Sequence, residues 1–452
     1  MQTQRDHVHA HQFQMARMSS SLIIGDPTPG ENPMKRTVTG TLVGLLLAVL
    51  IVVGFGIYGW IVPGGKTSWR QAGAIIVEKE TGTRYVLLNG TLHPALNMAS
   101  AMMINGPSAK VQLVSRNSLK GVPRGAPVGI AGAPQTMPDR TAMLRGPWLA
   151  CLGSSLSRDA DDQIGLNFDT AGQAQELPAD RFVYVTAGGS PYIVWRGGKH
   201  LAREDTVPVA LGIAGADPLP APRAWLDLLP DGPPVATPDI DGLGDAGPRI
   251  GGEAADIGQL FVQPRGTGGD QLFVLLRDGL APLNRTMFVL LQAATGNEPV
   301  RLAAADVVAA PRSDDRSLIE PLADLAAATH EQARGRVLCQ RQAPVPGLPA
   351  VAAVPVLAAP DHAGLTPDGR ATVRMRPGAG MLVYPVPMAN PRLPDPWFVS
   401  DEGKRHHLPD SRMMSNLKLS NGVMVPIPRG LLTGVPSGPE LTAQALLAQP
   451  KG

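Results

Sequence analysis

The hydrophobic pattern of the chain is dominated by one long apolar stretch near its start. From Val38 to Val62 the sequence contains no charged side chain. As a helix at about 1.5 Å per residue this stretch is roughly 37 Å long, enough to cross a hydrocarbon layer of about 30 Å with some tilt. Trp60, near its end, suits the membrane interface. A cleavable signal peptide would have a shorter apolar region closer to the N-terminus, so the pattern predicts a permanent transmembrane anchor over residues 37–62.

The charges that flank this helix favour a cytoplasmic N-terminus. Four basic residues precede it, of which Lys35 and Arg36 are adjacent to the apolar stretch, and three follow within about 20 residues. Residues 1–36 are therefore expected to be a cytoplasmic segment. Within it, Val8 to Ile24 mixes apolar and polar side chains and predicts an amphipathic helix.

Beyond the helix, a seven-residue phrase with the pattern apolar-x-x-apolar-Pro-x-small occurs four times. An aromatic-led strand that ends in glycine precedes each copy, and helix-compatible apolar stretches lie between the two. The separation between the glycine and the proline differs by no more than one position among the four copies. This regularity predicts four small α+β modules. The landmark residues are Gly90 and Pro123, Gly197 and Pro230, Gly279 and Pro311, and Gly403 and Pro436.

The two cysteines occupy equivalent places in two halves of the chain. Cys151 follows Gly90 at almost the same separation at which Cys339 follows Gly279. A duplicated, pseudo-twofold arrangement follows, in which two central segments pack together. Both cysteines lie beyond the membrane helix, where an oxidising compartment preserves disulfides. We therefore expect a Cys151–Cys339 disulfide; the alternative is two buried free thiols.

These landmarks give the expected domain boundaries. The repeat modules are residues 68–125, 181–235, 258–314 and 381–452, the last including a C-terminal tail. The central segments are residues 126–180 and 315–380, and a linker rich in proline, glycine and aspartate covers residues 236–257.

Composition and motifs do not indicate an active site. A net charge of +2 and 4% aromatic residues argue against nucleic-acid binding. The sequence around Lys66 resembles the end of a P-loop, but Trp60 stands where the first glycine should be. The G-x-G-x-x-G pattern of residues 242–247 lies among prolines without a following helix. We expect no catalytic residue, no cofactor and no metal site.

The other candidate ligands are also incomplete. Asp239, Asp241 and Asp245 lack the glutamate of an EF-hand, and His330-Glu331 lacks the second histidine of a zincin. His406-His407 has no nearby cysteine or paired carboxylates. We expect these side chains to have no catalytic role.

The chain resembles the EccB family, the membrane component of type VII (ESX) secretion systems of mycobacteria and related actinobacteria. The segments that carry the resemblance extend over nearly the whole length. They are His11-Gln12-Phe13 to Arg17-Met18 ahead of Gly25-Asp26, the early membrane helix, Arg84-Tyr85-Val86, Leu92-His93-Pro94, Asn97 to Ala101, Gly129 to Pro134, the region around Trp148 and Cys151, and Val435 to Leu441.

The resemblance implies a single-pass inner-membrane protein with a large periplasmic region. The expected fold is α+β: one transmembrane helix, then an elongated extracytoplasmic region of four small repeat modules around a β-rich central domain with one disulfide. Expected partners are EccC, which is an FtsK/SpoIIIE-type ATPase, the polytopic EccD, EccE and the mycosin protease, with self-association through the periplasmic domain. The implied function is a structural core subunit for export of WxG and PE/PPE-type proteins.

Two other functions stay open at this point. One is a cell-envelope protein that binds peptidoglycan, because small repeated modules can hold glycans. The other is an ATP hydrolase with an unconventional nucleotide site, because members of this family are described as ATPases although the sequence contains no complete nucleotide-binding motif.

Overall fold

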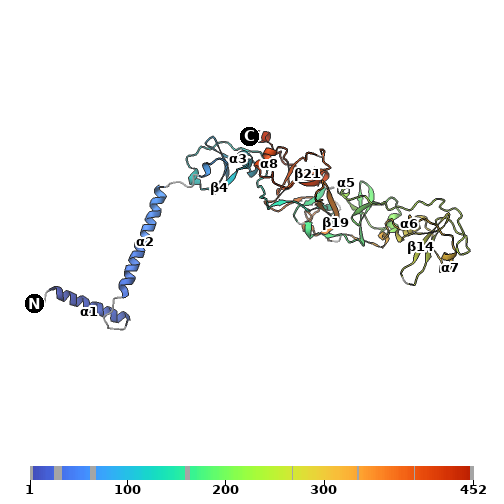
Figure 1. The fold of residues 1–452 in the computed structure, drawn as a ribbon, viewed down its shortest axis with the longest axis horizontal. Coiled ribbons are helices and arrows are strands. Elements are labelled where there is room, and N and C mark those ends of the chain that lie inside the picture. The colour runs from blue at the N-terminus through green and yellow to red at the C-terminus, as the bar shows by residue number, and fades with distance from the viewer. Residues whose placement is uncertain are drawn as a thin grey trace. The chain divides into compact units, whose positions relative to one another are not determined.

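The computed structural model describes residues 4–24, 33–61, 68–157, 163–169, 171–266, 268–332, 335–390 and 392–447. The chain divides into two compact units (Figure 1). The first unit contains residues 1–69 and 114–121, and the second contains residues 70–113 and 122–452.

Two long helices, α1 (Gln4–Ile24) and α2 (Pro33–Ile61), form most of the first unit; the 3-10 helices η1 (Ser68–Arg70) and η2 (Arg116–Leu119) are short. In α1, Val8, Met15 and Leu22 recur at every second helical turn and lie on one side, whereas Phe13 lies on the other. All four side chains are exposed.

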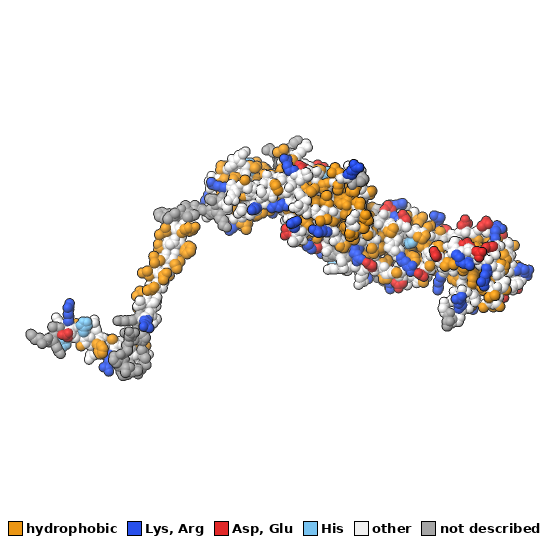
Figure 2. Space-filling model, in the orientation of Figure 1, with side chains coloured by type: hydrophobic (Ala, Val, Ile, Leu, Met, Phe, Trp, Pro, Cys, Tyr) orange, Lys and Arg blue, Asp and Glu red, His pale blue; other side chains and the backbone are white. Residues whose placement is uncertain are grey.

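Helix α2 contains the predicted anchor. Its stretch Arg36–Gly59 is long and apolar enough to cross a membrane, and its side chains are exposed along the whole length (Figure 2). Val38 lies in the second turn of α2 and Trp60 in its last turn, whereas Val62 and Lys66 lie outside the described residues.

The second unit contains four sheets with one topology. In each, the strand order is third, second, first, fourth, and a helix follows the third strand. In repeats 2, 3 and 4 the fourth strand runs parallel to the first. The strands are β1 (Ala74–Glu78), β2 (Arg84–Leu88), β3 (Thr91–Pro94) and β4 (Lys110–Val114) in repeat 1; β9 (Arg181–Ala187), β10 (Ser190–Trp195), β11 (Gly198–Leu201) and β12 (Leu219–Pro220) in repeat 2; β13 (Leu260–Gln263), β14 (Gln271–Leu276), β15 (Gly279–Pro282) and β16 (Val300–Arg301) in repeat 3; β21 (Gly380–Val386), β22 (Trp397–Ser400), β23 (Arg405–His407) and β24 (Val425–Pro428) in repeat 4.

Short helices accompany these sheets. The repeat helices are α3 (Met98–Asn105), α4 (Val207–Ala210) and α5 (Arg223–Leu226), α6 (Arg285–Thr295) and α7 (Ala304–Ala309), and α8 (Ser411–Asn416) and α9 (Arg429–Gly434), followed by α10 (Ala443–Leu447). Single 3-10 turns are η3 (Gly153–Ser155), η4 (Ala171–Gln173), η5 (Leu325–Ala327) and η6 (Pro360–His362). Asn97, Asn284 and Asp410 cap α3, α6 and α8 by accepting hydrogen bonds from backbone N–H groups of the first turn.

A six-stranded central sheet joins the two halves of the second unit, which are residues 70–113 with 122–235, and residues 258–452. The first half supplies β6 (Trp148–Leu152), β7 (Ile164–Asn167) and β8 (Gln175–Glu176), and the second half supplies β18 (Val337–Pro344), β19 (Val351–Ala358) and β20 (Val373–Arg374). The strand order is β20-β7-β6-β18-β19-β8. The outermost strands are thus exchanged, because β20 pairs with the first half and β8 with the second.

Two further short strands extend the same exchange. Strand β5 (Met143–Leu144) of the first half pairs with β21 of repeat 4, and β17 (Thr329–His330) of the second half pairs with β9 of repeat 2. Each half therefore completes a sheet of the other half. Separating the halves would break backbone hydrogen bonds in three sheets.

The apolar cores connect the repeats in pairs. Repeats 1 and 4 share a core that includes Val86 and Phe398, and repeats 2 and 3 share a core that includes Ile193 and Met287. The largest core lies between the central sheet and repeats 2 and 4. Figure 1 shows α3 of repeat 1 beside α8 of repeat 4, consistent with this pairing.

The connection over residues 236–257 is packed against the repeats. Its apolar residues Ile240, Ile250 and Ile257 are buried in two of the cores. This segment is therefore part of the folded structure although it has no apolar periodicity. Burial of its single isoleucines between turns stabilises the position of the segment on the repeats.

Candidate functional site

The Cys151–Cys339 disulfide lies at the centre of the joined halves. Cys151 on β6 stands directly opposite Cys339 on β18, and both are fully buried. The bond links residues 188 apart in sequence. The disulfide expected from the equivalent positions of the cysteines is thus present in the fold.

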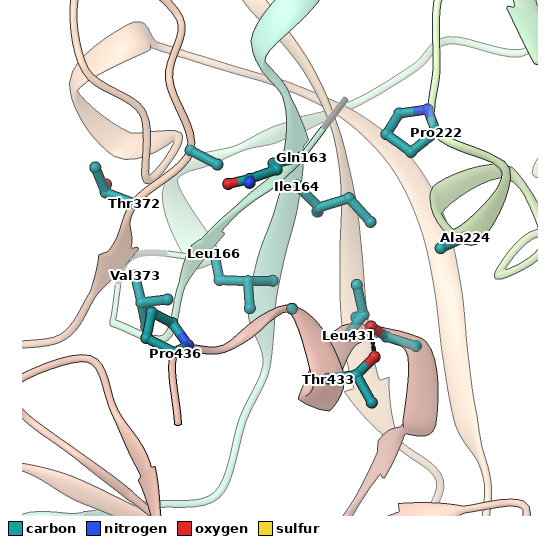
Figure 3. Close-up of a pocket in the computed structure, with 13 residues that line it drawn as sticks. Gln163, Ile164, Leu166, Pro222, Ala224, Thr372, Val373, Leu431, Thr433 and Pro436 are labelled. Carbon is teal, nitrogen blue, oxygen red and sulfur yellow. Dashed lines mark hydrogen bonds between the residues drawn. The ribbon is translucent and has the colours of Figure 1, made fainter. Parts of the chain in front are cut away.

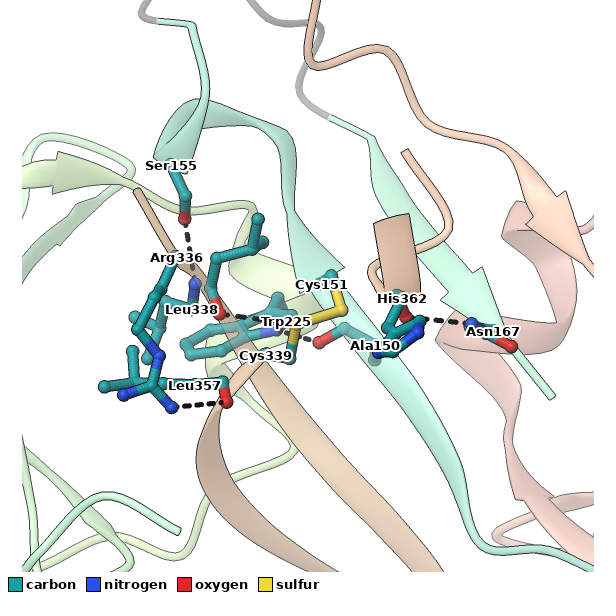
Figure 4. Close-up of a disulfide and its surroundings, with 11 residues drawn as sticks. Ala150, Cys151, Ser155, Asn167, Trp225, Arg336, Leu338, Cys339, Leu357 and His362 are labelled. Carbon is teal, nitrogen blue, oxygen red and sulfur yellow. Dashed lines mark hydrogen bonds between the residues drawn. A yellow bond between two sulfur atoms is a disulfide. The ribbon is translucent and has the colours of Figure 1, made fainter. Parts of the chain in front are cut away.

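Buried polar groups around the disulfide are paired both within the first half and across the boundary between halves. Trp225 of repeat 2 donates from its indole Nε1 to the carbonyl of Ala150 at 2.8 Å, and Gln340 of the second half donates to the carbonyl of Trp225 at 2.7 Å (Figure 4). Asn167 likewise donates to the carbonyl of His362 at 2.8 Å. The bonds made by Gln340 and Asn167 fix the relative register of the two halves, because breaking either leaves a buried polar group unpaired.

Helices α5 and α9 meet where the halves join. They have equivalent positions in repeats 2 and 4, and a Cβ added to Gly430 would lie 3.7 Å from the Cβ of Ala224. A cavity of about 480 Å³ lies beside this contact, and apolar side chains such as Leu166, Val373 and Leu431 line it (Figure 3). None of the side chains that line it is ionisable, so the described lining offers a ligand neither an acid nor a base.

The landmark residues lie in corresponding parts of each repeat. Gly90, Gly197 and Gly403 sit in the turn between the second and third strands, whereas Gly279 is the first residue of β15. In repeats 1 and 2, Asn89-Gly90 and Arg196-Gly197 both have positive φ, as type I′ hairpins require. Each landmark proline accepts a hydrogen bond at its carbonyl from an N–H of the third strand. The donors and distances are Leu92 to Pro123 at 2.8 Å, Lys199 to Pro230 at 3.0 Å, Leu280 to Pro311 at 2.8 Å, and Arg405 to Pro436 at 2.9 Å.

A second hydrogen bond completes each of these contacts. We call each pair of hydrogen bonds, between the seven-residue phrase and the third strand, a clip. The small residue two positions after the proline donates its N–H back to the same third-strand residue. These bonds run from Gly125 to Leu92 at 3.0 Å, Gly232 to Lys199 at 2.9 Å, Ser313 to Leu280 at 3.0 Å, and Gly438 to Arg405 at 2.9 Å. The nearly constant glycine-to-proline spacing follows, because both ends of the interval are fixed on one strand.

Three of the clips contain a histidine whose structural role is not evident from the sequence. The Nδ1 atoms of His93, His200 and His406 each lie 2.8–3.0 Å from a backbone carbonyl oxygen further along the chain, in Ala126, Pro233 and Pro439 respectively. Since a carbonyl only accepts, Nδ1 carries the proton. The signal was present in the sequence, because each histidine stands at the third position after its landmark glycine.

The clip histidines explain why a small residue ends each phrase. A Cβ added to Gly125, Gly232 or Gly438 would overlap the ring of the clip histidine in that repeat. None of these three glycines has a positive φ. Glycine is therefore needed at these positions because of the space taken by the histidine ring, and not because of the backbone conformation. In repeat 3 the histidine position is Ala281, and Ser313 is accommodated.

His406 is the most buried of the clip histidines, and burial lowers its pKa below the ordinary 6.5, although the hydrogen bond to the Pro439 carbonyl opposes this. Burial also lowers the pKa of His330, which stacks on Phe182 at 5.5 Å. Both imidazoles are therefore neutral in the folded state near pH 7, whereas the unfolded chain binds protons more readily. Their contribution to stability is complete above about pH 6.5 and is lost as the pH falls through the lower folded-state pKa values.

We expect the melting temperature of the protein to fall between about pH 7.5 and about pH 5.5, and to fall less in a His406→Asn, His330→Asn double variant. Asparagine keeps a donor near the position of Nδ1 but does not titrate. Differential scanning fluorimetry of both proteins over this range measures the effect. Identical pH dependence of the two would contradict the assignment.

The remaining candidate ligands make structural contacts. Arg277 of repeat 3 binds Asp241 at 2.9 Å and Asp245 at 3.1 Å, which neutralises the acidic residues around the G-x-G-x-x-G pattern. Glu331 pairs with Arg181 at 2.6 Å. Among the described residues, no group of three or more His, Cys, Asp or Glu side chains is arranged to hold a metal ion.

These features define a class of protein: one long apolar helix, followed by a sheet-rich region of four repeats whose halves are joined by exchanged strands and a disulfide. The chain belongs to the family described as type VII secretion system ESX-1, transport TM domain B, whose model matches residues 1–451.

Several relatives share this family. The chain is 28% identical over 333 residues to the ESX-3 secretion system ATPase EccB3 of Mycobacterium tuberculosis (strain CDC 1551 / Oshkosh), a match that covers 68% of this chain and 60% of that relative. It is 27% identical over 473 residues to the protein of the same name from Mycolicibacterium smegmatis (strain ATCC 700084 / mc(2)155), covering 98% and 90%.

Solved structures share the fold. A chain in the structure of an intact ESX-5 inner membrane complex matches with a TM-score of 0.57 at 23% identity, covering 99% of this chain and 96% of that chain. A chain of an EccB3 dimer from the ESX-3 core complex matches with a TM-score of 0.55 at 22% identity, covering 82% and 99%.

Proposed function

We propose that this protein is a structural core subunit of a type VII (ESX) secretion membrane complex. The family match over residues 1–451 is the observation that carries this proposal. The fold supports it, because exchanged strands and a buried disulfide hold the two halves in one register, as a rigid connecting element requires.

In this proposal α2 anchors the protein in the inner membrane, the N-terminal segment with α1 is cytoplasmic, and the repeat region is periplasmic. Lys35 and Arg36 next to the apolar stretch support this orientation. A disulfide between Cys151 and Cys339 is also consistent with an oxidising compartment.

The proposed partners are EccC, EccD, EccE and the mycosin protease, together with further copies of this chain. Solved structures of similar fold come from an ESX-5 inner membrane complex and an EccB3 dimer, which supports assembly and self-association. The proposed cargo is the WxG and PE/PPE-type proteins that such systems export.

Affinity purification tests this function. A C-terminal tag, extraction of native membranes in mild detergent and mass spectrometry should recover an FtsK/SpoIIIE-type ATPase, a polytopic subunit and EccE. Recovery of the tagged chain alone, from a preparation in which the other subunits stay associated with one another, would refute the proposal.

The relatives are named as ATPases, and Lys66 is the one local candidate for a nucleotide contact. Because Trp60 replaces the first P-loop glycine, we expect Lys66→Ala to leave ATP hydrolysis by the purified complex unchanged. Phosphate release is the measurement, with Arg70→Ala as the control for loss of a nearby positive charge. A loss of more than about tenfold in K66A alone, with assembly intact, would assign a transition-state contact to Lys66.

A further inference from the structure

The fourth strand of repeat 1 differs from its three counterparts. Strand β12 contains Pro220, β24 contains Pro426 and Pro428, and β16 has only two residues. Strand β4 has five residues, contains no proline and is the outer strand of its sheet in the described part of the chain. Prolines and short strands protect sheet edges against pairing with other chains, so among the four fourth strands, as far as the structure describes them, β4 is the one with an unprotected edge.

The backbone of β4 offers hydrogen-bonding groups on its outer side. Lys110 donates its N–H inward, to the carbonyl of Gly73 at 2.9 Å. Because alternate residues of a strand direct their backbone groups to opposite sides, the N–H and C=O groups of Val111 and Leu113 face outward. Their side chains are 52% and 60% exposed. Apolar side chains on an unprotected edge are a feature that sheets of soluble domains normally avoid.

An apolar groove adjoins this edge. Val111 lines a cavity of about 580 Å³ together with Met98, Met102 and Met137. Methionine side chains are flexible and polarisable, and surfaces rich in them adapt to apolar side chains of different shapes.

The polar residues around the groove give it a positive charge. Arg140 and Lys418 lie beside the methionines. The third charged residue is Asp139, whose carboxylate accepts hydrogen bonds from Thr141 and Ala142. The hydrogen bond from the Thr141 side chain, together with those from the backbone, lowers the pKa of Asp139, whose carboxylate is thus already engaged within its own turn. Lys418 likewise donates from Nζ to the carbonyl of Ala109 at 2.7 Å. Arg140 is therefore the charged group best placed to meet a ligand.

We infer that the β4 edge and the adjoining groove bind an extended segment of another protein in which every second side chain, the set that faces the groove, is apolar or acidic. The segment adds a strand to the sheet through the backbone of Val111 and Leu113. On the side of the segment that faces the groove, its apolar side chains enter between the methionines and its carboxylates approach Arg140. The backbone bonds supply affinity and the side chains supply selectivity. This site does not depend on the proposed secretion role.

Site-directed photo-crosslinking in native membranes tests the inference. A benzophenone amino acid replaces Leu113 in the full-length chain, and mass spectrometry maps the crosslinked peptide. We expect an adduct with a segment of a different protein in which every second residue is apolar or acidic. Val111→Pro, which removes one outward N–H without touching the inward bonds, and Arg140→Glu should each reduce the yield about tenfold. The same probe at Val308, a similarly apolar and exposed position on α7, is the matched control.

Several results would overturn the inference. They are an adduct with lipid only, an adduct only with a second copy of this chain, no adduct above that of the Val308 control, or an adduct unaffected by both substitutions. Thermal unfolding of each variant shows whether the fold is kept. If Val111→Pro unfolds repeat 1, the result with Arg140→Glu decides.

Discussion

Replacing both cysteines, in Cys151→Ala, Cys339→Ala, should lower the free energy of unfolding of the oxidised protein by roughly 3 to 5 kcal/mol. The bond spans a sequence separation of 188, so its loss releases a long loop in the unfolded chain. It also removes the covalent link between β6 and β18 at the centre of the joined sheet. Denaturant unfolding of the wild-type and variant proteins without reductant measures the difference.

Reduction provides the control for this prediction. In a strong reductant the wild-type curve should approach that of the double-alanine variant, which itself should not change. Because both sulfurs are fully buried, the native protein should be reduced only as fast as it opens. Coincident wild-type and variant curves without reductant would show that non-covalent contacts alone hold the halves together.

A double-mutant cycle at the fourth clip should show strong coupling between His406 and Gly438. Gly438→Ser places a side chain against the buried ring of His406 and should cost about 1 to 3 kcal/mol. Adding His406→Ala makes the pair resemble Ala281 and Ser313 of repeat 3, in which serine is accommodated. The double variant should therefore recover at least about 1 kcal/mol relative to the sum of the single effects. Denaturant unfolding of all four proteins measures the coupling.

The first clip is the matched control. His93 and Gly125 have the same geometry, but the side chain of His93 is partly exposed and can turn away from an added side chain. Gly125→Ser should consequently cost less than Gly438→Ser, with a smaller coupling. Additive effects at both clips would mean that the ring does not determine the choice of glycine.

Some residues of the clips can be recognised from the sequence alone, and others cannot. Gly90 stands out because a positive φ in a hairpin turn restricts the residue type. The role of His93 was missed because its partner is the backbone carbonyl of Ala126, which any residue provides. Comparison of the repeats on their glycines would have shown that His93, His200 and His406 are equivalent.

The exchanged strands cannot be recognised from the sequence pattern. Strands β8 and β20 have only two residues each, too few for an alternating pattern. Their partners lie in the other half, at sequence separations that local propensity does not encode. The same limit applies to repeat 1, whose core is completed by repeat 4, the most distant repeat in sequence.

The sequence by itself determined the features that depend on local chemistry: the long apolar helix, the four landmark phrases, and the equivalence of Cys151 and Cys339. Apolar length, turn-forming residues and spacing are visible without knowledge of the partners. Only the tertiary structure decided which repeats share a core, which strands cross between halves, and which edge stays open at β4. The shared cores, the exchanged strands and the open edge depend on contacts between residues far apart in the chain. Backbone groups and apolar surfaces make these contacts, and they do not require a particular residue type.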